Sequence, residues 1–322
     1  MQSHDTIFDP IQEELVKVED CLKSIRNVHD SNLSEMLDHS LGRAGKRIRP
    51  VLTLLSGKFY RNGLEHLLPM AASVELLHTA TLVQDDAIDK SAVRHGRPTV
   101  NDIWGENKAF VLGDYLFAKA GELCASTGNL RAIKLFSQTL ATMSMGELNQ
   151  AFNAFNLKQT REQYLDRICK KTASLFALAT ESGAILSQAP EGSVEILREY
   201  GCNLGIAFQI VDDILDFIGT EEELGKPVGS DLTQGTLTLP ALLILEHYSE
   251  GSPIQKLFEN QGDLDTKERV IELIRNSSVV QECYDIAANY CARACQNLNL
   301  LPDNASRQAL MDLTDYIVRR KK

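Results

Sequence analysis

The sequence predicts an all-α protein: a single large antiparallel helix bundle around a central cavity, with residues 1–322 forming one domain. Apolar residues recur every three or four positions along most of the chain, beginning with Ile11, Leu15 and Val18, and this spacing is typical of amphipathic helices. Strand signals are nearly absent, since the alternation in 236–239 is short and is stopped by a proline. Short turn segments and the lack of any linker favour helices that run antiparallel across short loops.

The expected helices are assigned from the apolar periodicity and from the turn residues between them. They cover residues 10–28, 31–41, 50–60, 66–89, 107–126, 129–156, 160–188, 192–219, 238–249, 251–260, 265–276, 278–299 and 304–320. Three intervening loops are rich in glycine, proline or basic residues: 42–50, 92–99 and 220–235. The basic end of the chain, from Arg319 to Lys322, is expected to be solvated.

The composition is that of a soluble globular protein, with 43% hydrophobic and 24% charged residues. A formal net charge of −11 argues against a nucleic-acid partner. The seven cysteines include no C-x-x-C pair, so a disulfide framework or a zinc site is disfavoured. The amino-terminal segment does not resemble a signal peptide, and no apolar run approaches the roughly 18 residues of a membrane span. We therefore expect a cytoplasmic protein without an integral membrane segment.

Two motifs share the spacing Asp-Asp-x-x-Asp, each at the end of an apolar helical stretch: Asp85, Asp86 and Asp89, and Asp212, Asp213 and Asp216. Residues four apart lie on one helix face, so the first and last aspartate of each motif point the same way. Such carboxylates repel one another unless a cation neutralises them. One motif alone would most simply be a solvated acidic helix end, but two copies favour a site for Mg²⁺, which takes carboxylate, water and phosphate oxygens.

The basic loop 42–50 carries Lys46 and Arg49 close to glycine and directly before a helix. Most basic loops are simply solvated, but this arrangement also suits phosphate binding. Together with the aspartate motifs, it predicts a cavity that binds polyanions through metal ions. Such a site can stabilise a departing diphosphate by charge neutralisation, without a protein acid or base.

These motifs resemble those of the trans-isoprenyl diphosphate synthases, the polyprenyl synthetase family, and in particular its medium- and long-chain members. The matching segments are AGKRIRP (44–50), LLHTATLVQDDAID (76–89), RHGRPT (94–99), GEL-x-Q (146–150), KTA (171–173), GIAFQIVDDILD (205–216), GKPVGSDL (225–232) and TLP (238–240). The resemblance covers most of the chain, and it implies an isoprenoid synthase-like helical bundle that forms a homodimer.

The resemblance also implies a role for each matched residue. All six aspartates of the two motifs would ligate Mg²⁺, with three ions per active site. Isopentenyl diphosphate would be held by Lys46, Arg49, His78 and His95. The allylic diphosphate would be held by Arg94, Lys171, Gln209 and Lys226, and a carbocation would face Gln209 and the carbonyls of Lys171 and Thr172. Gly146, Glu147 and Gln150 are more simply explained by packing and a buried hydrogen bond.

The implied reaction is head-to-tail prenyl transfer. Magnesium and the basic residues draw off the allylic diphosphate and leave a carbocation. The π-bond of isopentenyl diphosphate then attacks this cation, and the released diphosphate takes up the proton. The product is an all-trans polyprenyl diphosphate.

Product length is expected to depend on the residues before Asp85, along which the growing chain would run. Short-chain members of the family carry large aromatic residues four or five positions ahead of this aspartate, where this chain has Thr81 and Ala80. The next candidates for a pocket floor are Leu77 and Val74. Because one helical turn rises about 5.4 Å, close to one isoprene unit, an open pocket predicts products longer than about C20, in the range of about C25 to C50.

Three residues depart from the family pattern. Ala44 stands where a glycine is usual, which should change little. His95 replaces an arginine, and a neutral imidazole would bind an anion less well. Thr236 replaces a lysine on the allylic side, so substrate affinity is in question.

Several alternatives stay open. One is a short-chain farnesyl or geranylgeranyl diphosphate synthase, and another is the non-catalytic subunit of a two-component prenyl synthase, although two complete aspartate motifs argue against a pure scaffold. A class I terpene cyclase would not explain the second motif. A di-iron carboxylate bundle would need Glu-x-x-His pairs, and a helical interaction module would need no metal motif.

Overall fold

The computed structural model describes residues 7–42, 45–60, 64–94, 96–225, 227–248, 252–260 and 263–320. In these parts of the chain the regular structure is helical, apart from a two-stranded antiparallel ribbon of β1 (Val93–Arg94) and β2 (Arg97–Pro98). The prediction of an all-α fold is confirmed. The helices are η2 (Asp9–Ile11), α1 (Gln12–Ile25), α2 (Ser31–Leu41), α3 (Ile48–Gly57), α4 (Leu64–Ile88), α5 (Val100–Trp104), α6 (Glu106–Ser126), α7 (Leu130–Phe152), α8 (Arg161–Ile168), η3 (Cys169–Ala173), α9 (Ser174–Leu186), α10 (Glu191–Ile218), α11 (Glu221–Leu224), α12 (Ser230–Thr233), α13 (Leu239–His247), α14 (Pro253–Glu259), α15 (Leu264–Arg275), α16 (Val279–Cys295), η4 (Leu298–Leu300) and α17 (Ala305–Arg319).

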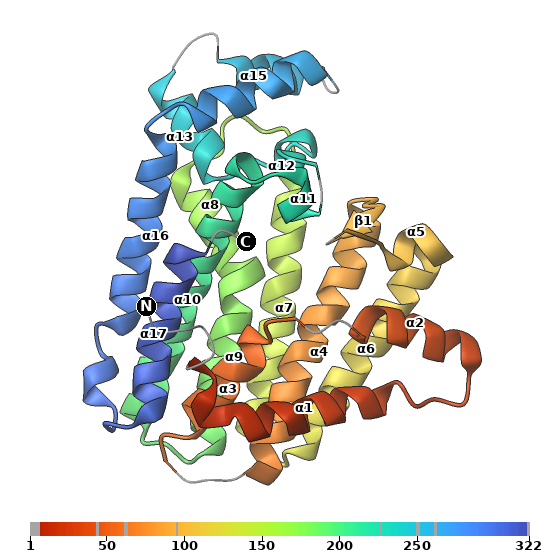
Figure 1. Ribbon diagram of the computed structural model, residues 1–322, viewed down its shortest axis with the longest axis vertical. Helices are drawn as coiled ribbons and strands as arrows, with labels where there is room; N and C mark the ends of the chain where they lie inside the picture. Colours follow the sequence, from red (N-terminus) through yellow and green to blue (C-terminus); the bar gives the residue numbers. More distant parts are fainter. Residues whose placement is uncertain are drawn as a thin grey trace.

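The long helices run side by side along the molecule, with α1 lying across one end (Figure 1). Helix α9 packs against α3, α4 and α10, so it lies between the two helices that carry the aspartate motifs. Helices α16 and α17 pack against α10 on its other side. None of the helices in the described ranges combines the length and the apolar character that a membrane crossing requires.

Two apolar clusters hold this arrangement together. The first joins α3, α4, α6 and α9 through fully buried residues such as Leu52, Leu76 and Phe176. The second surrounds the carboxyl-terminal half of α10 and includes Ile214 and Leu243. Each aspartate motif is therefore anchored by a helix whose other faces are buried in a core, and this fixes the direction of its carboxylates.

The predicted helix 160–188 is present but interrupted. Helix α8 begins at a capping box formed by Thr160 and Gln163, and the five residues of η3 that follow form a π-helix before α9. Helix α10 approaches η3 so closely that a Cβ on Gly205 would lie 2.6 Å from the Cα of Ala173. The π turn contains neither glycine nor proline, so its sequence gives no sign that the α-helix is interrupted there. Single π turns inside α-helices often mark functional sites.

Candidate functional site

The first aspartate motif lies at the carboxyl-terminal end of α4, where Asp85 and Asp89 share one face. The Lys171 Nζ lies 3.7 Å from an oxygen of Asp85 and 2.5 Å from an oxygen of Glu147. Burial raises the pKa of Asp85 to about 6, and the neighbouring charges of Glu147 and Asp89 add to this rise while Lys171 opposes it. The pKa of Asp89 is raised as well, mainly by burial. One lysine therefore faces three carboxylates, which leaves an excess of negative charge.

The middle aspartate of this motif faces elsewhere. Asp86 is buried, and one of its oxygens accepts a hydrogen bond of 2.7 Å from the Nε of Arg94. Arg94 belongs to β1, so this ion pair fastens the β-ribbon to the end of α4. The predicted anion-binding arginine and the predicted metal ligand are thus brought together, and Asp86 orients Arg94 toward the site.

In the second motif, on α10, the middle aspartate is again buried and hydrogen-bonded to protein groups. Asp213 is 2% exposed and accepts hydrogen bonds from the hydroxyl of Tyr164 at 2.7 Å and from Nε2 of Gln209 at 2.8 Å. Burial raises its pKa to about 7. Asp216 is also buried, and the Ser230 hydroxyl donates to it at 3.2 Å. Only Asp212 keeps substantial exposure, at 41% of its side chain.

The two motifs border one acidic space. Asp231, in the short helix α12 after the second motif, contributes through its charge to the raised pKa of Asp89 on one side and of Asp213 on the other. Its carboxylate therefore lies close enough to the ends of α4 and α10 to act on both. The sequence placed neither Asp231 nor Tyr164 in the site, although Asp231 belongs to the quoted GKPVGSDL segment.

The π-helix η3 projects Lys171 and Thr172 toward this space. The Thr172 hydroxyl donates to Oε1 of Gln209 at 2.7 Å, while the Lys171 Nζ lies 3.5 Å from Oε1 of Gln150. On α7, a Cβ on Gly146 would lie 2.8 Å from the backbone nitrogen of Lys171. The GEL-x-Q segment therefore combines the packing expected of Gly146 with direct contacts from Glu147 and Gln150 to the site lysine.

The two arginines of the basic loop, Arg47 and Arg49, have different surroundings. Arg47 is committed to ion pairs with Glu19 and with Glu75, the second at 2.8 Å. Arg49 instead stacks over the ring of Phe176 at 5.0 Å. Among the described residues its guanidinium makes no hydrogen bond or ion pair, and its Nε is a buried donor without an acceptor. Burial lowers the pKa of Arg49 to about 10. A bound anion would therefore stabilise the charged form of this side chain.

Two further predicted residues of the isopentenyl diphosphate subsite lie near the same region. Lys46 is exposed, with its Nζ 5.2 Å from the centre of the Tyr316 ring. His78 is half-buried on α4, two turns before Asp85. Contact of either residue with a substrate stays a prediction.

His95, Lys226 and Ala44 lie outside the described residues. Thr236 is buried, and its backbone nitrogen donates to the carbonyl of Asp231.

The expectation that the carboxyl-terminal basic residues are solvated is wrong for Arg320. Its side chain is 7% exposed, its guanidinium lies 3.8 Å from the centre of the Phe208 ring, and it is 2.5 Å from an oxygen of Asp212. It also donates to the carbonyl of Phe208 at 2.8 Å. The end of the chain therefore reaches the second aspartate motif (Figure 1). The sequence contains a sign of this burial, because Arg320 follows the buried Leu313 and Ile317 at helical spacing and so lies on the same face.

Arg320 and its neighbour offer a matched test of this correction. We expect Arg320→Ala to lower the free energy of unfolding by about 2 to 3 kcal/mol, because a partly buried ion pair, a carbonyl hydrogen bond and a cation–π contact are lost together. Arg319→Ala should change it by less than about 0.5 kcal/mol, since its side chain is 81% exposed. Urea unfolding of both variants measures the difference, and equal effects would contradict the placement of Arg320.

The residues proposed to set product length are on α4. Leu77, Ala80 and Val74 have no exposed surface, whereas Thr81 is partly exposed and donates its hydroxyl to the carbonyl of His78 at 2.8 Å. Thr81 precedes Asp85 by one turn on the same face. A bulky residue at position 81 would therefore project beside the first motif, while one at position 80 would have to displace core neighbours.

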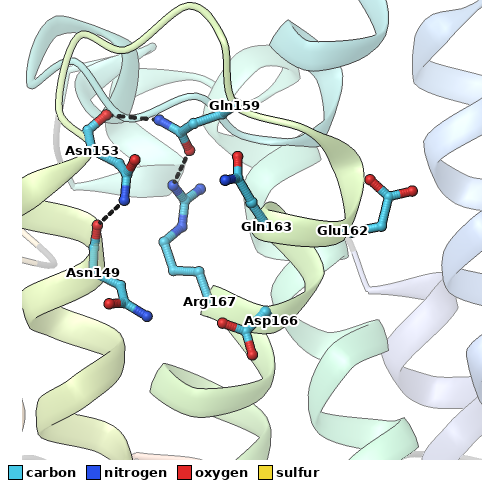
Figure 2. A pocket seen from close by; sticks show the side chains of 7 residues that line it. All are labelled: Asn149, Asn153, Gln159, Glu162, Gln163, Asp166 and Arg167. Atoms are coloured by element: carbon cyan, nitrogen blue, oxygen red, sulfur yellow. Dashed lines mark hydrogen bonds between the residues drawn. The ribbon is translucent and has the colours of Figure 1, made fainter.

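A separate polar pocket of about 390 Å³ is lined by residues of α7, α8 and the loop between them: Asn149, Asn153, Gln159, Glu162, Gln163, Asp166 and Arg167. Figure 2 shows its hydrogen-bonded chain, in which Gln159 donates to the carbonyl of Asn153 and accepts from Arg167. Arg167 also donates to the carbonyl of Leu237 at 2.6 Å. Its cation is satisfied by protein groups, so this pocket is not the predicted diphosphate site.

The donor set of the two motifs fits Mg²⁺. It consists of carboxylate oxygens, and burial together with neighbouring carboxylates raises the pKa of Asp85, Asp89 and Asp213. Within the described ranges, no group of three or more His, Cys, Asp or Glu side chains is placed to hold a metal ion by itself. Mg²⁺ does not need such a group, because it keeps several waters and takes one or two carboxylates together with substrate phosphates.

Known proteins match this chain over nearly its whole length. Residues 30–274 match the family profile described as "Polyprenyl synthetase". The chain is 39% identical to "Heptaprenyl diphosphate synthase component 2" of Geobacillus stearothermophilus over 98% of both chains, and 37% identical to a "Prenyl transferase" of Synechocystis sp. over 99% of both. The solved structure of heptaprenyl diphosphate synthase from Staphylococcus aureus superposes with a TM-score of 0.93 at 36% identity, covering 97% of this chain and 99% of that one.

Proposed function

The chain belongs to the polyprenyl synthetase family, and from this premise we propose that its two aspartate motifs form the active site. It is a trans-polyprenyl diphosphate synthase, a prenyltransferase whose products are longer than C20. The assignment of the site rests on Asp89, Asp213 and Asp231. Beside burial, the charge of Asp231 raises the pKa of both other aspartates, so the three border one acidic space. Lys171 and Arg94 lie at its edge, where they can bind an anion.

The six aspartates have two different roles, which burial alone does not separate, because Asp216 is as buried as Asp213. Asp85, Asp89 and Asp212 would hold Mg²⁺, with Asp216 completing the second cluster and three ions per site. When bound, the metal supplies Lewis-acid neutralisation of the departing diphosphate. Asp86 and Asp213 are buried and hydrogen-bonded to protein donors, so their role is to hold Arg94, Tyr164 and Gln209 in place.

The two substrates would occupy opposite ends of the site. Lys171 and Arg94 bind the allylic diphosphate beside the first motif, and Lys226 adds a third cation. Arg49, Lys46 and His78 bind isopentenyl diphosphate, with His95 in the same subsite. Arg49 supports this division best, because a desolvated guanidinium that lacks an acceptor gains most from an incoming diphosphate.

The carbocation would face Gln209. Its amide is fixed at both ends, because Nε2 donates to Asp213 and Oε1 accepts from Thr172. The second lone pair of Oε1 can therefore point a partial negative charge at the developing cation without reorganisation. The same contacts hold Thr172, whose carbonyl would contribute in the same way.

The proposed site is tested by diphosphate release. We expect the purified protein to release one diphosphate per condensation from isopentenyl diphosphate and an allylic diphosphate when Mg²⁺ is present, and none in excess EDTA. Omission of either substrate is the control. Release from the allylic substrate alone at the same rate would indicate a terpene cyclase or a phosphatase instead.

Thr81 offers a test of how the site sets product length. Thr81→Phe should shorten the main product to about C15 or C20 while turnover persists, because the plug stands one turn, about 5.4 Å, before the first aspartate. Thr81→Ser keeps the hydroxyl that donates to the carbonyl of His78 and adds no bulk, so it should leave the distribution unchanged. Chromatography of the dephosphorylated products measures both. If Thr81→Phe still made long chains, another helix would set the length.

A second candidate function follows from two relatives, each of which is named as component 2 of a heptaprenyl diphosphate synthase. This chain would then be the catalytic component of a two-component enzyme. Both complete aspartate motifs support a catalytic rather than a scaffolding role. A well-folded chain that binds substrate and Mg²⁺ but turns over only when cell extract is added would favour this alternative.

Assembly and location complete the proposal. We expect a homodimer, as the family resemblance implies, and action in the cytoplasm. Sedimentation of the purified protein tests the first expectation, and fractionation of cells that express it tests the second.

A further inference from the structure

Two cysteines from different helices meet beside the proposed active site. Cys169, the first residue of η3, and Cys202, on α10, have their sulfur atoms 4.0 Å apart. Both are free thiols that keep some exposed surface. Cys291 and Cys295, in contrast, both face Thr314 on α17 and form no such pair.

The helices are unusually close at this point. A Cβ on Gly201 would lie 2.6 Å from the carbonyl oxygen of Phe176, and one on Gly205 would lie 2.6 Å from the Cα of Ala173. Glycines on α10 thus let its backbone run directly against η3 and α9. A disulfide has its sulfurs about 2.05 Å apart, so an approach of only about 2 Å would join the two cysteines.

The pair is also chemically unequal. The contact with Cys202 lowers the pKa of Cys169 to about 7, against the opposing effect of burial. The pKa of Cys202 is raised by the same contact. At neutral pH Cys169 is therefore the nucleophile of the pair, since the thiolate is the form that attacks a disulfide.

We propose that Cys169 and Cys202 form a thiol–disulfide switch that responds to low-molecular-weight disulfides such as oxidised glutathione. The Cys169 thiolate attacks one sulfur of oxidised glutathione, and one glutathione leaves as the thiolate. Cys202 then attacks the sulfur of Cys169 in the mixed disulfide and expels the second glutathione. The protein loses two electrons and two protons, and one glutathione disulfide becomes two glutathione molecules.

The bridge would act on the site through η3. Cys169 lies two residues before Lys171 and three before Thr172, which contact Asp85, Glu147 and Gln209. Cys169 is the first residue of this π turn, so drawing it toward α10 would displace the turn that carries Lys171 and Thr172. A displacement of about 1 Å at a positioning group can cost about 100-fold in rate. We expect oxidation to lower kcat by at least about tenfold. This effect rests on the proposed function, whereas formation of the bridge does not.

The test uses the full-length protein in glutathione buffers of increasing oxidised fraction. Peptide mapping by mass spectrometry without reduction should show Cys169 linked to Cys202, and kcat should fall in step and recover with dithiothreitol. Cys169→Ser, which lacks the attacking thiol, should keep its activity in oxidising buffer, and Cys295→Ser, as the matched control, should lose activity like the wild type.

Three results would overturn the switch: no linkage between Cys169 and Cys202 in fully oxidised buffer, linkage with an unchanged kcat, or equal inactivation of Cys169→Ser. A reduced wild-type protein without prenyl transfer would instead contradict the proposed function. The mapping experiment would still decide whether the bridge forms.

Discussion

Asp85→Asn should lower kcat by about 1,000-fold or more and leave the protein folded. The substitution keeps the shape of the side chain but removes the charge that faces the proposed metal and Lys171. Loss of one preorganised electrostatic contact at a developing charge typically costs about 100- to 1,000-fold, and here a metal ligand is lost as well. Steady-state diphosphate release in saturating Mg²⁺ measures the effect. Asp20→Asn on α1, an exposed position, is the control and should behave as the wild type.

The same variant should gain stability in metal-free buffer. The pKa of Asp85 rises from 3.8 to about 6 on folding, so the folded state disfavours its ionised form. The resulting cost is absent below pH 3.8, grows between the two values and is complete above pH 6. Thermal unfolding in EDTA at pH 7.5 should therefore show a melting temperature for Asp85→Asn at or above that of the wild type. A clearly lower one would mean that Asp85 serves the fold rather than the site.

Arg49→Met should raise the KM for isopentenyl diphosphate by about 30-fold or more and leave the KM for the allylic substrate nearly unchanged. Loss of a desolvated charge pair costs about 2 to 5 kcal/mol in binding. The fold should not suffer, because Arg49 has a buried donor without an acceptor and its charge is disfavoured by burial. Methionine keeps the apolar contact with Phe176.

Arg47 provides the contrast two residues away. It is paired with Glu19 and Glu75 inside the protein, so Arg47→Met should lower stability and leave the KM of the folded fraction unchanged. Initial rates with each substrate varied in turn, together with urea unfolding, separate the two variants. A larger KM effect at position 47 than at position 49 would reverse the assignment of the two arginines.

The helices and the two motifs were predictable because both depend on local spacing. The period of apolar residues fixed the extent of α4 and α10 to within a few residues, and the Asp-Asp-x-x-Asp spacing fixed which carboxylates share a face. The separation of Asp86 and Asp213 from the exposed aspartates was not predictable in the same way. It depends on donors brought by distant elements, such as Arg94 and Tyr164.

Other features depend on contacts between segments that are remote in the sequence. Arg47 and Arg49 look alike in the chain, and only the positions of Glu75 and Phe176 decide which is a structural cation. Arg320 lies more than a hundred residues from Asp212, so a basic tail was the simpler interpretation. The π turn at η3 contains no residue type that distinguishes it from an α-helix, and it lies where α10 approaches closely.

The length of the product made by the purified chain is the most direct test of whether this protein is a long-chain prenyltransferase. The protein is incubated with Mg²⁺, an allylic diphosphate and radiolabelled isopentenyl diphosphate, and the dephosphorylated products are separated by chain length. We expect a main product longer than C20 that disappears in EDTA and in Asp85→Asn. A wild-type product that stops at about C15 or C20, or one that persists in Asp85→Asn, would contradict it.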